Sequence, residues 1–123
     1  MKRKVFDLEI RLLKFAVQVC EIAEALPSAS FTGRHVANQL IRAGTSPAPN
    51  YGEAQSAESR RDFIHKMKIC LKELRETHIW LQFILLKDMV DSERVKIVEI
   101  EADELIAIFV KSIETAKANL RKS

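Results

Sequence analysis

The stretch QLIRAGTSPAPNYGE, residues 39–53, has the pattern of an amphipathic helix that two prolines ought to break. Pro47 and Pro49 each remove a backbone donor and push against the carbonyl four residues earlier. The polar side chains nevertheless keep helical steps of three and four through both prolines, at Gln39, Arg42, Ser46, Asn50 and Glu53. The stretch therefore predicts one helix, from an N-cap near Thr32 to about Ala54, with a kink at the prolines.

Three further helices are indicated by apolar residues that recur three, four or seven positions apart. The first ends at Pro27 and carries Phe6, Leu13, Ala16, Val17, Cys20, Ala23 and Leu26. The third begins near Ser56 or Ser59, ends at Lys87 and carries the seam Phe63, Met67, Cys70, Leu74, Thr77, Leu81 and Ile84. The last, with an irregular start expected before about Glu101, carries Ile97, Ile100, Leu105, Ile108, Phe109 and Ile113.

Four helices joined by short connections favour antiparallel neighbours. We therefore expect an all-α fold, an antiparallel up-down-up-down four-helix bundle with a proline-kinked second helix. A chain of 123 residues is the size of one domain, so we expect a single domain over residues 1–123.

The chain has features of a cytoplasmic protein. Cys20 and Cys70 lie fifty residues apart without a C-x-x-C pair, which indicates core thiols in a reducing compartment. Residues 1–15 begin with basic residues, but charges interrupt the apolar run that an export signal needs. No apolar stretch approaches the roughly twenty residues of a membrane span, so no membrane partner is expected.

The polar stripe of the second helix has a counterpart on the third. With an antiparallel turn near Ser56, Arg42 comes level with Glu73, and we expect it to pair with Glu73 or Glu76. Asn50 or Glu53 is expected to satisfy backbone groups freed by the prolines or by the start of the third helix. These five residues are predicted to form a structural polar network.

The segments QLIRAGTSPAPNYGEA and ESRRDFIHKMKICLKELRETHIWL resemble the four-helix-bundle family first associated with intervening sequences in 23S ribosomal RNA genes. The likeness covers roughly residues 10–110, and the chain departs from the pattern at Pro47, Tyr51 and Ala54. The resemblance implies a homopentamer arranged as a barrel and no known enzyme activity. It also implies kinship with accessory proteins of diversity-generating retroelements, whose expected partners are nucleic acid and a reverse transcriptase.

The chain carries a net charge of +3, and the excess of basic residues lies on the third helix. Residues 59–90 contain seven bases and four acids. The candidate nucleic-acid-binding residues form a stripe at helical spacing, with one cation beside it: Arg60, Arg61, Lys68, Lys72 and Arg75. The stripe contains no aromatic residues, so it favours electrostatic contact with RNA or DNA backbones that is indifferent to base sequence. The alternative is a basic face that only contacts water.

Two other functions fit parts of the sequence. Apolar residues off the seam favour a protein-partner or assembly scaffold, with the oligomer interface at Ile64, Leu71, Trp80 and Phe83. A remote alternative is a di-metal bundle enzyme, for which Asp62 and His65 form one acid-x-x-His pair, joined by Glu21, Glu24, Glu73 and Glu76. A second acid-x-x-His pair is missing from the sequence, so we predict no catalytic residue, no metal and no cofactor.

Overall fold

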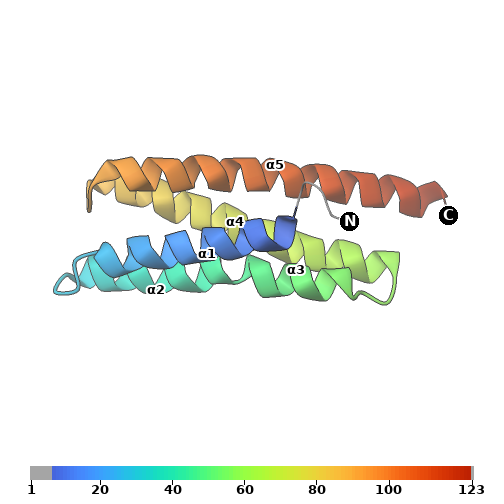
Figure 1. Ribbon diagram of the computed structural model, residues 1–123, viewed down its shortest axis with the longest axis horizontal. Coiled ribbons are helices and arrows are strands. Elements are labelled where there is room, and N and C mark those ends of the chain that lie inside the picture. The colour runs from blue at the N-terminus through green and yellow to red at the C-terminus, as the bar shows by residue number, and fades with distance from the viewer. Residues whose placement is uncertain (1–6, 123) are drawn as a thin grey trace.

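The structure is a computed structural model that describes residues 7–122. The described residues form the helices α1 (Leu8–Ala25), α2 (Phe31–Thr45), α3 (Pro47–Gln55), α4 (Arg60–Lys87) and α5 (Ser92–Lys122). Figure 1 shows them as four rods, because α2 and α3 follow one another along one side of the molecule. Successive rods run in opposite directions, so the chain is an up-down-up-down bundle and the predicted all-α class is confirmed.

The proline stretch forms two abutting helices with one residue between them. Ser46, the intervening residue, keeps right-handed helical angles of φ −75° and ψ −39°, so α3 continues along the side of the bundle that α2 began. Pro47 is the first residue of α3, where a missing amide hydrogen removes no helical hydrogen bond. The N-cap of α2 is Ser30, two residues before the predicted Thr32, and its hydroxyl accepts from the Gly33 amide.

The core face of α1 differs from the predicted face. Its buried residues include Leu8, Leu12, Phe15, Val19 and Ile22, whereas Leu13 and Val17 are 48% and 57% exposed. Apolar residues surround most of this helix, so periodicity admits two overlapping faces, and the face with the larger side chains buries more area. Phe6, also predicted for the core, lies outside the described residues.

α4 has the buried seam that the sequence predicted, with one change at its start. Ile64, expected at an outer interface, is 7% exposed and belongs to the core, while Phe63 is only partly buried. The helix ends at Asp88, whose left-handed backbone, with φ of 55°, closes the last turn.

α5 is helical from Ser92 onward, so the irregular start expected before Glu101 is wrong. Ile97 and Ile100, expected inside, are 61% and 56% exposed. Val95 and Val98 are buried in their place, because they keep helical phase with the buried residues Ala102, Leu105, Phe109 and Ile113. The prediction followed the larger isoleucines and thereby chose the outer face.

The rods are arranged so that α1 and α4 lie on a diagonal. α1 packs on α2, α3 and α5, and α4 packs on the same three helices, but within residues 7–122 α1 and α4 make no backbone contact. At Gly44 the packing is tight, since a Cβ there would lie 2.4 Å from Val19 Cγ1. None of the described helices is long and apolar enough to cross a membrane.

Candidate nucleic-acid interface

The seam between α2 and α4 holds a compact polar network. The Arg42 guanidinium donates to Glu73 Oε1 at 3.2 Å and also contacts Glu76. It donates to Gln39 Oε1 at 3.2 Å, and the Trp80 indole donates to Glu76 Oε2 at 3.3 Å. Only 12% of the Glu73 side chain is exposed, so its carboxylate depends on Arg42 for a countercharge. The network joins two helices inside one chain.

The helix junction is held by Asn50 and not by Glu53. Asn50 Nδ2 donates to both the carbonyl and the hydroxyl of Ser46 at 2.9 Å, which fixes the residue between α2 and α3. The exposed Glu53 side chain takes part in no hydrogen bond or ion pair among residues 7–122. The expectation named Asn50 or Glu53, and Asn50 makes the contact with Ser46, while a place for Glu53 in the network stays a prediction.

Cys70 also contacts the junction, from the core side of α4. Its Sγ lies 3.6 Å from the carbonyl oxygen of Pro47, a carbonyl in the first turn of α3. Burial raises the pKa of the Cys70 thiol to about 12, so the sulfur stays protonated at neutral pH. A protonated, buried thiol is a packing group and not a nucleophile.

The outer line of α4 carries four cations that have no partner among residues 7–122. Arg61, Lys68, Lys72 and Arg75 are exposed, and none makes an ion pair or hydrogen bond within the described part of the chain. By contrast, Lys66, also on α4, pairs with Asp62 at 3.5 Å. The helix begins sharply before this line, because the Ser59 hydroxyl accepts from the Asp62 amide.

Part of this line opens into a groove between α4 and α5. The groove has a volume of about 280 Å³ and is lined by Arg61, Ile64, His65, Lys68, Lys117 and Leu120. No carboxylate is among these lining residues. Lys117 of α5 is the groove residue that the sequence analysis did not identify. Only the packing of α5 on α4 places it beside Arg61 and Lys68.

The other predicted cations lie away from this groove. Arg60 lines a separate hollow with Phe63 and Asn119, and its guanidinium donates to the Asn119 carbonyl at 3.1 Å. Lys72 and Arg75 border a shallow hollow of about 500 Å³, whose lining also includes Leu71 and Ile79. The five predicted residues therefore belong to three neighbouring surfaces.

The predicted interface residues of α4 are also divided. Trp80 is partly buried, with its ring centroid 5.7 Å from His35 and 5.6 Å from Phe83. Leu71 is partly buried and Phe83 is 37% exposed. More exposed are two residues that the prediction omitted, Ile79 at 62% and Leu86 at 90%.

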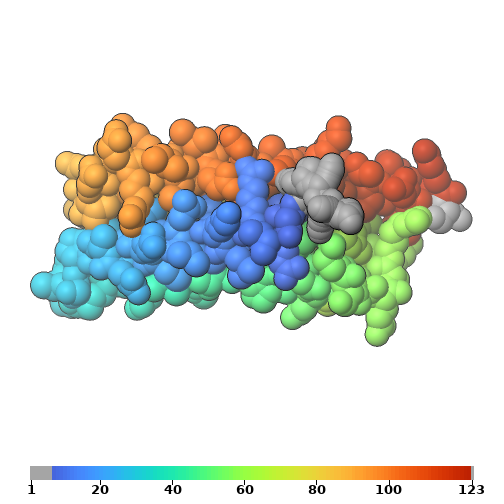
Figure 2. All heavy atoms as spheres, in the orientation of Figure 1, coloured from blue at the N-terminus to red at the C-terminus, as the bar shows by residue number. Residues whose placement is uncertain are grey.

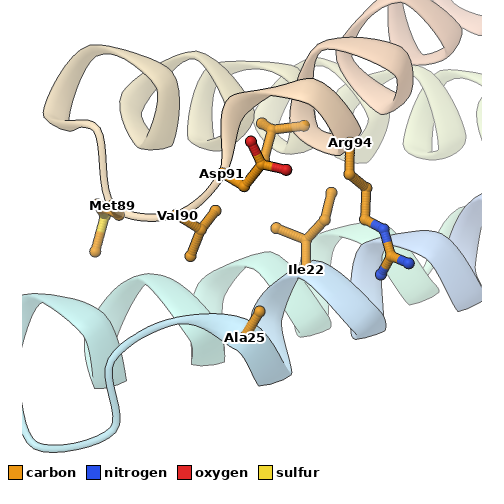
Figure 3. Close-up of a pocket in the computed structure, with 7 residues that line it drawn as sticks. Ile22, Ala25, Met89, Val90, Asp91 and Arg94 are labelled. Carbon is orange, nitrogen blue, oxygen red and sulfur yellow. The ribbon is translucent and has the colours of Figure 1, made fainter.

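A further hollow, of about 570 Å³, lies between the end of α1 and the turn from α4 to α5 (Figure 3). Its lining includes Ile22, Ala25, Met89 and Val90, and its charged side chains are Asp91 and Arg94. Arg94 pairs with Glu21 at 3.4 Å. The lining offers apolar surface and one acid and one base, but no nucleophile or metal-ligand set.

The carboxylates considered for a di-metal site pair with different cations and do not converge. Glu73 and Glu76 face Arg42, Glu21 faces Arg94, and Asp62 faces Lys66. In residues 7–122, no three side chains of His, Cys, Asp or Glu come close enough together to hold a metal ion.

Comparison with known proteins places this architecture in a family. Residues 10–111 match the family model described as 23S rRNA-intervening sequence protein, and the chain belongs to that family. A crystal structure of a protein of unknown function from the S23 ribosomal protein family of Bacteroides thetaiotaomicron is similar, with a TM-score of 0.78 and 29% identity. The match covers 87% of this chain and 98% of that one. Among curated proteins, none matches the chain.

Proposed function

We propose that this family member is a cytoplasmic, non-enzymatic bundle that binds the sugar–phosphate backbone of RNA or DNA through the groove between α4 and α5. The observation that carries the proposal is the convergence of Arg61, Lys68 and Lys117 on one groove without a lining carboxylate. Phosphate oxygens are the ligands that such unpaired ammonium and guanidinium groups favour. The family's name points to ribosomal RNA, and the cations of the groove are the groups that would bind its phosphates.

The groove favours backbone contact over base recognition. Its apolar residues, Ile64 and Leu120, are aliphatic, so they give no flat ring on which a base could stack. The proposed contact therefore involves fewer residues than the five-residue stripe predicted from the sequence. It should not depend on base sequence. Lys72 and Arg75 continue the positive line toward the middle of α4 without lining the groove.

The proposal includes a homo-oligomer, which the family resemblance gives as a pentamer. One groove with three cations neutralises few phosphates, and weak contacts become strong binding when several copies engage one strand. The modest net charge of +3 on each chain is then repeated across the assembly.

The test is a salt titration of binding, measured by fluorescence anisotropy with labelled single-stranded RNA and DNA of matched length. Three phosphate contacts per groove give a slope of about −2 in log affinity against log salt for single strands. Raising the salt from about 50 to 200 mM should then weaken binding by roughly 20-fold per groove engaged. Affinity that stays constant over this range would refute phosphate recognition by the groove.

A further inference from the structure

The groove between α4 and α5 contains a histidine that the proposed function does not use. His65 lies on α4 between two of the groove's cations, four residues after Arg61 and three before Lys68. Residues at these spacings share one face of a helix, so the imidazole belongs to the same line as the positive side chains. Lys117 lines the groove from the neighbouring helix, α5. The groove thus presents four nitrogen-bearing side chains to a bound phosphate.

The packing of α5 on α4 creates this arrangement at one end of the bundle. Figure 1 shows the last turns of α5 at the same end as the first turns of α4, and Figure 2 shows the red end of α5 above the green segment that leads into α4. Arg60, in the first turn of α4, donates to the Asn119 carbonyl of α5 at 3.1 Å. The groove and its histidine are therefore features of the folded bundle itself.

The other two histidines of the sequence have different surroundings. His78 Nε2 lies 2.7 Å from Glu99 Oε2, and the ring of His35 packs edge-on against Trp80 with 5.7 Å between their centroids. His65 is exposed and makes no hydrogen bond or ion pair with another residue among 7–122. Its ring nitrogens are therefore available to a ligand in the groove.

The charged residues that neighbour the groove along α4 and α5 include acids, but these acids do not line it. Asp62, three residues before His65 on α4, pairs with Lys66 at 3.5 Å. Glu114 and Arg121 flank the stretch of α5 that borders the groove, and neither is among its lining residues. A phosphate bound in the groove would therefore bring a negative charge to a lining that contains no carboxylate.

We infer that His65 is a fourth phosphate contact of this groove, one that depends on pH. Histidine changes its charge between pH 5 and 8, and both nitrogens of its protonated ring donate hydrogen bonds. A phosphate bound beside Arg61, Lys68 and Lys117 favours the protonated form of the neighbouring imidazole, because their charges are opposite. By linkage, protonation strengthens binding as the pH falls below neutral, and this contribution is lost as the pH rises. The inference rests on the proposed function, since it concerns the same groove.

The experiment measures the salt dependence of binding at about pH 7.5 and about pH 5.5, on either side of the range in which histidine titrates. Fluorescence anisotropy is recorded with labelled oligo(U) and oligo(dT) of matched length, whose bases gain no proton in this range. Three phosphate contacts per groove predict a slope of about −2 at the higher pH, and four predict about −3 at the lower pH. Affinity at low salt should rise roughly fivefold at the lower pH, the scale of one added charged contact.

Two substitutions of His65 and one matched control isolate the imidazole. The His65→Gln variant should keep a slope of about −2 at both pH values and lose the rise in affinity. The His65→Lys variant should have the fourth contact at both pH values, with a slope of about −3. The control, His35→Gln, removes an imidazole outside the groove and should respond to pH as the wild type does. Both histidines are exposed, so folding should persist, and circular dichroism checks it at each pH.

The outcomes separate this inference from the proposed function. A His65→Gln variant that keeps the wild-type response to pH would overturn the role of His65, while salt-dependent binding at about pH 7.5 would still support the groove. A wild type with the same affinity and slope at both pH values would overturn the role of His65 as well. Wild-type binding that does not respond to salt at about pH 7.5 would refute the groove itself, and His65 as a contact within it.

Discussion

Charged side chains follow two lines on α4, and the lines differ in what faces them. On the seam with α2, Glu73 and Glu76 have Arg42 as a partner, and Trp80 completes the network. On the outer line, Arg61 and the cations that follow it have no partner within residues 7–122. Both lines belong to one helix, but the seam acids face Arg42 of α2, whereas the outer cations face no acid that pairs with them among residues 7–122.

This difference separates residues that maintain the fold from residues that are free to bind. When one residue of an internal ion pair is replaced, the other charge loses its partner, so the free energy of unfolding falls. A charge without an internal partner contributes little to stability, and its removal is felt only when a ligand is present. Variants on the two lines should therefore change different measurements.

The largest expected effect is a loss of nucleic-acid affinity when the three cations of the groove are replaced by acids. Changing Arg61, Lys68 and Lys117 together to Glu should weaken RNA binding by at least about 100-fold at low salt, because phosphate attraction becomes repulsion. Fluorescence anisotropy measures the affinity, and urea unfolding should show a nearly unchanged midpoint.

A matched control separates the groove from net charge. Lys14, Lys96 and Lys111 are exposed and lie outside the groove, and changing them to Glu gives the same shift of six charges, from +3 to −3. We expect this variant to bind several-fold more weakly but far better than the groove variant. Equal losses in the two variants would show that overall charge decides binding.

The second effect is on folding, at the seam. Arg42→Ala leaves the mostly buried Glu73 without its countercharge, and we expect a loss of about 1 to 2 kcal/mol in the free energy of unfolding. Urea denaturation measures the loss, with Lys68→Ala on the outer line as the comparison, expected within about 0.5 kcal/mol of wild type. Equal effects of the two substitutions would remove the distinction between the lines.

The smallest effect concerns Trp80, which belongs to the seam through a single hydrogen bond. Trp80→Phe keeps an aromatic ring beside His35 and Phe83 but removes the 3.3 Å bond to Glu76. We expect less than about 1 kcal/mol of lost stability and unchanged RNA affinity. Unfolding is followed by circular dichroism and not by tryptophan fluorescence, because the substitution removes the only tryptophan in the sequence. A several-fold loss of RNA affinity here would place Trp80 in the binding surface instead.

Much of the fold could be predicted from the sequence, because local rules decide it. Pro27 and the Asp88 turn end their helices, and the seam of α4 from Met67 to Ile84 has a clear heptad-like period. Prediction failed on α1 and α5, where isoleucines, leucines and valines surround the helix. On such helices the inward face is chosen by packing against neighbours, and the period alone gives two answers.

The candidate site was predicted only in part for a similar reason. The cations of α4 share one helix and could be found by their spacing, but Lys117 lies 49 positions after Lys68 in the sequence. Likewise, Ile79 and Leu86 continue the outer line, yet their exposure follows only from knowing which face of α4 is buried.

The sequence by itself determined the helical class, the positions of the turns and the line of cations on α4, because each depends on residues close together in the chain. The tertiary structure decided which faces are inside, which charges have partners and where Lys117 lies. Those properties arise from contacts between helices, and burial or pairing of a side chain depends on what packs against it from a distant segment.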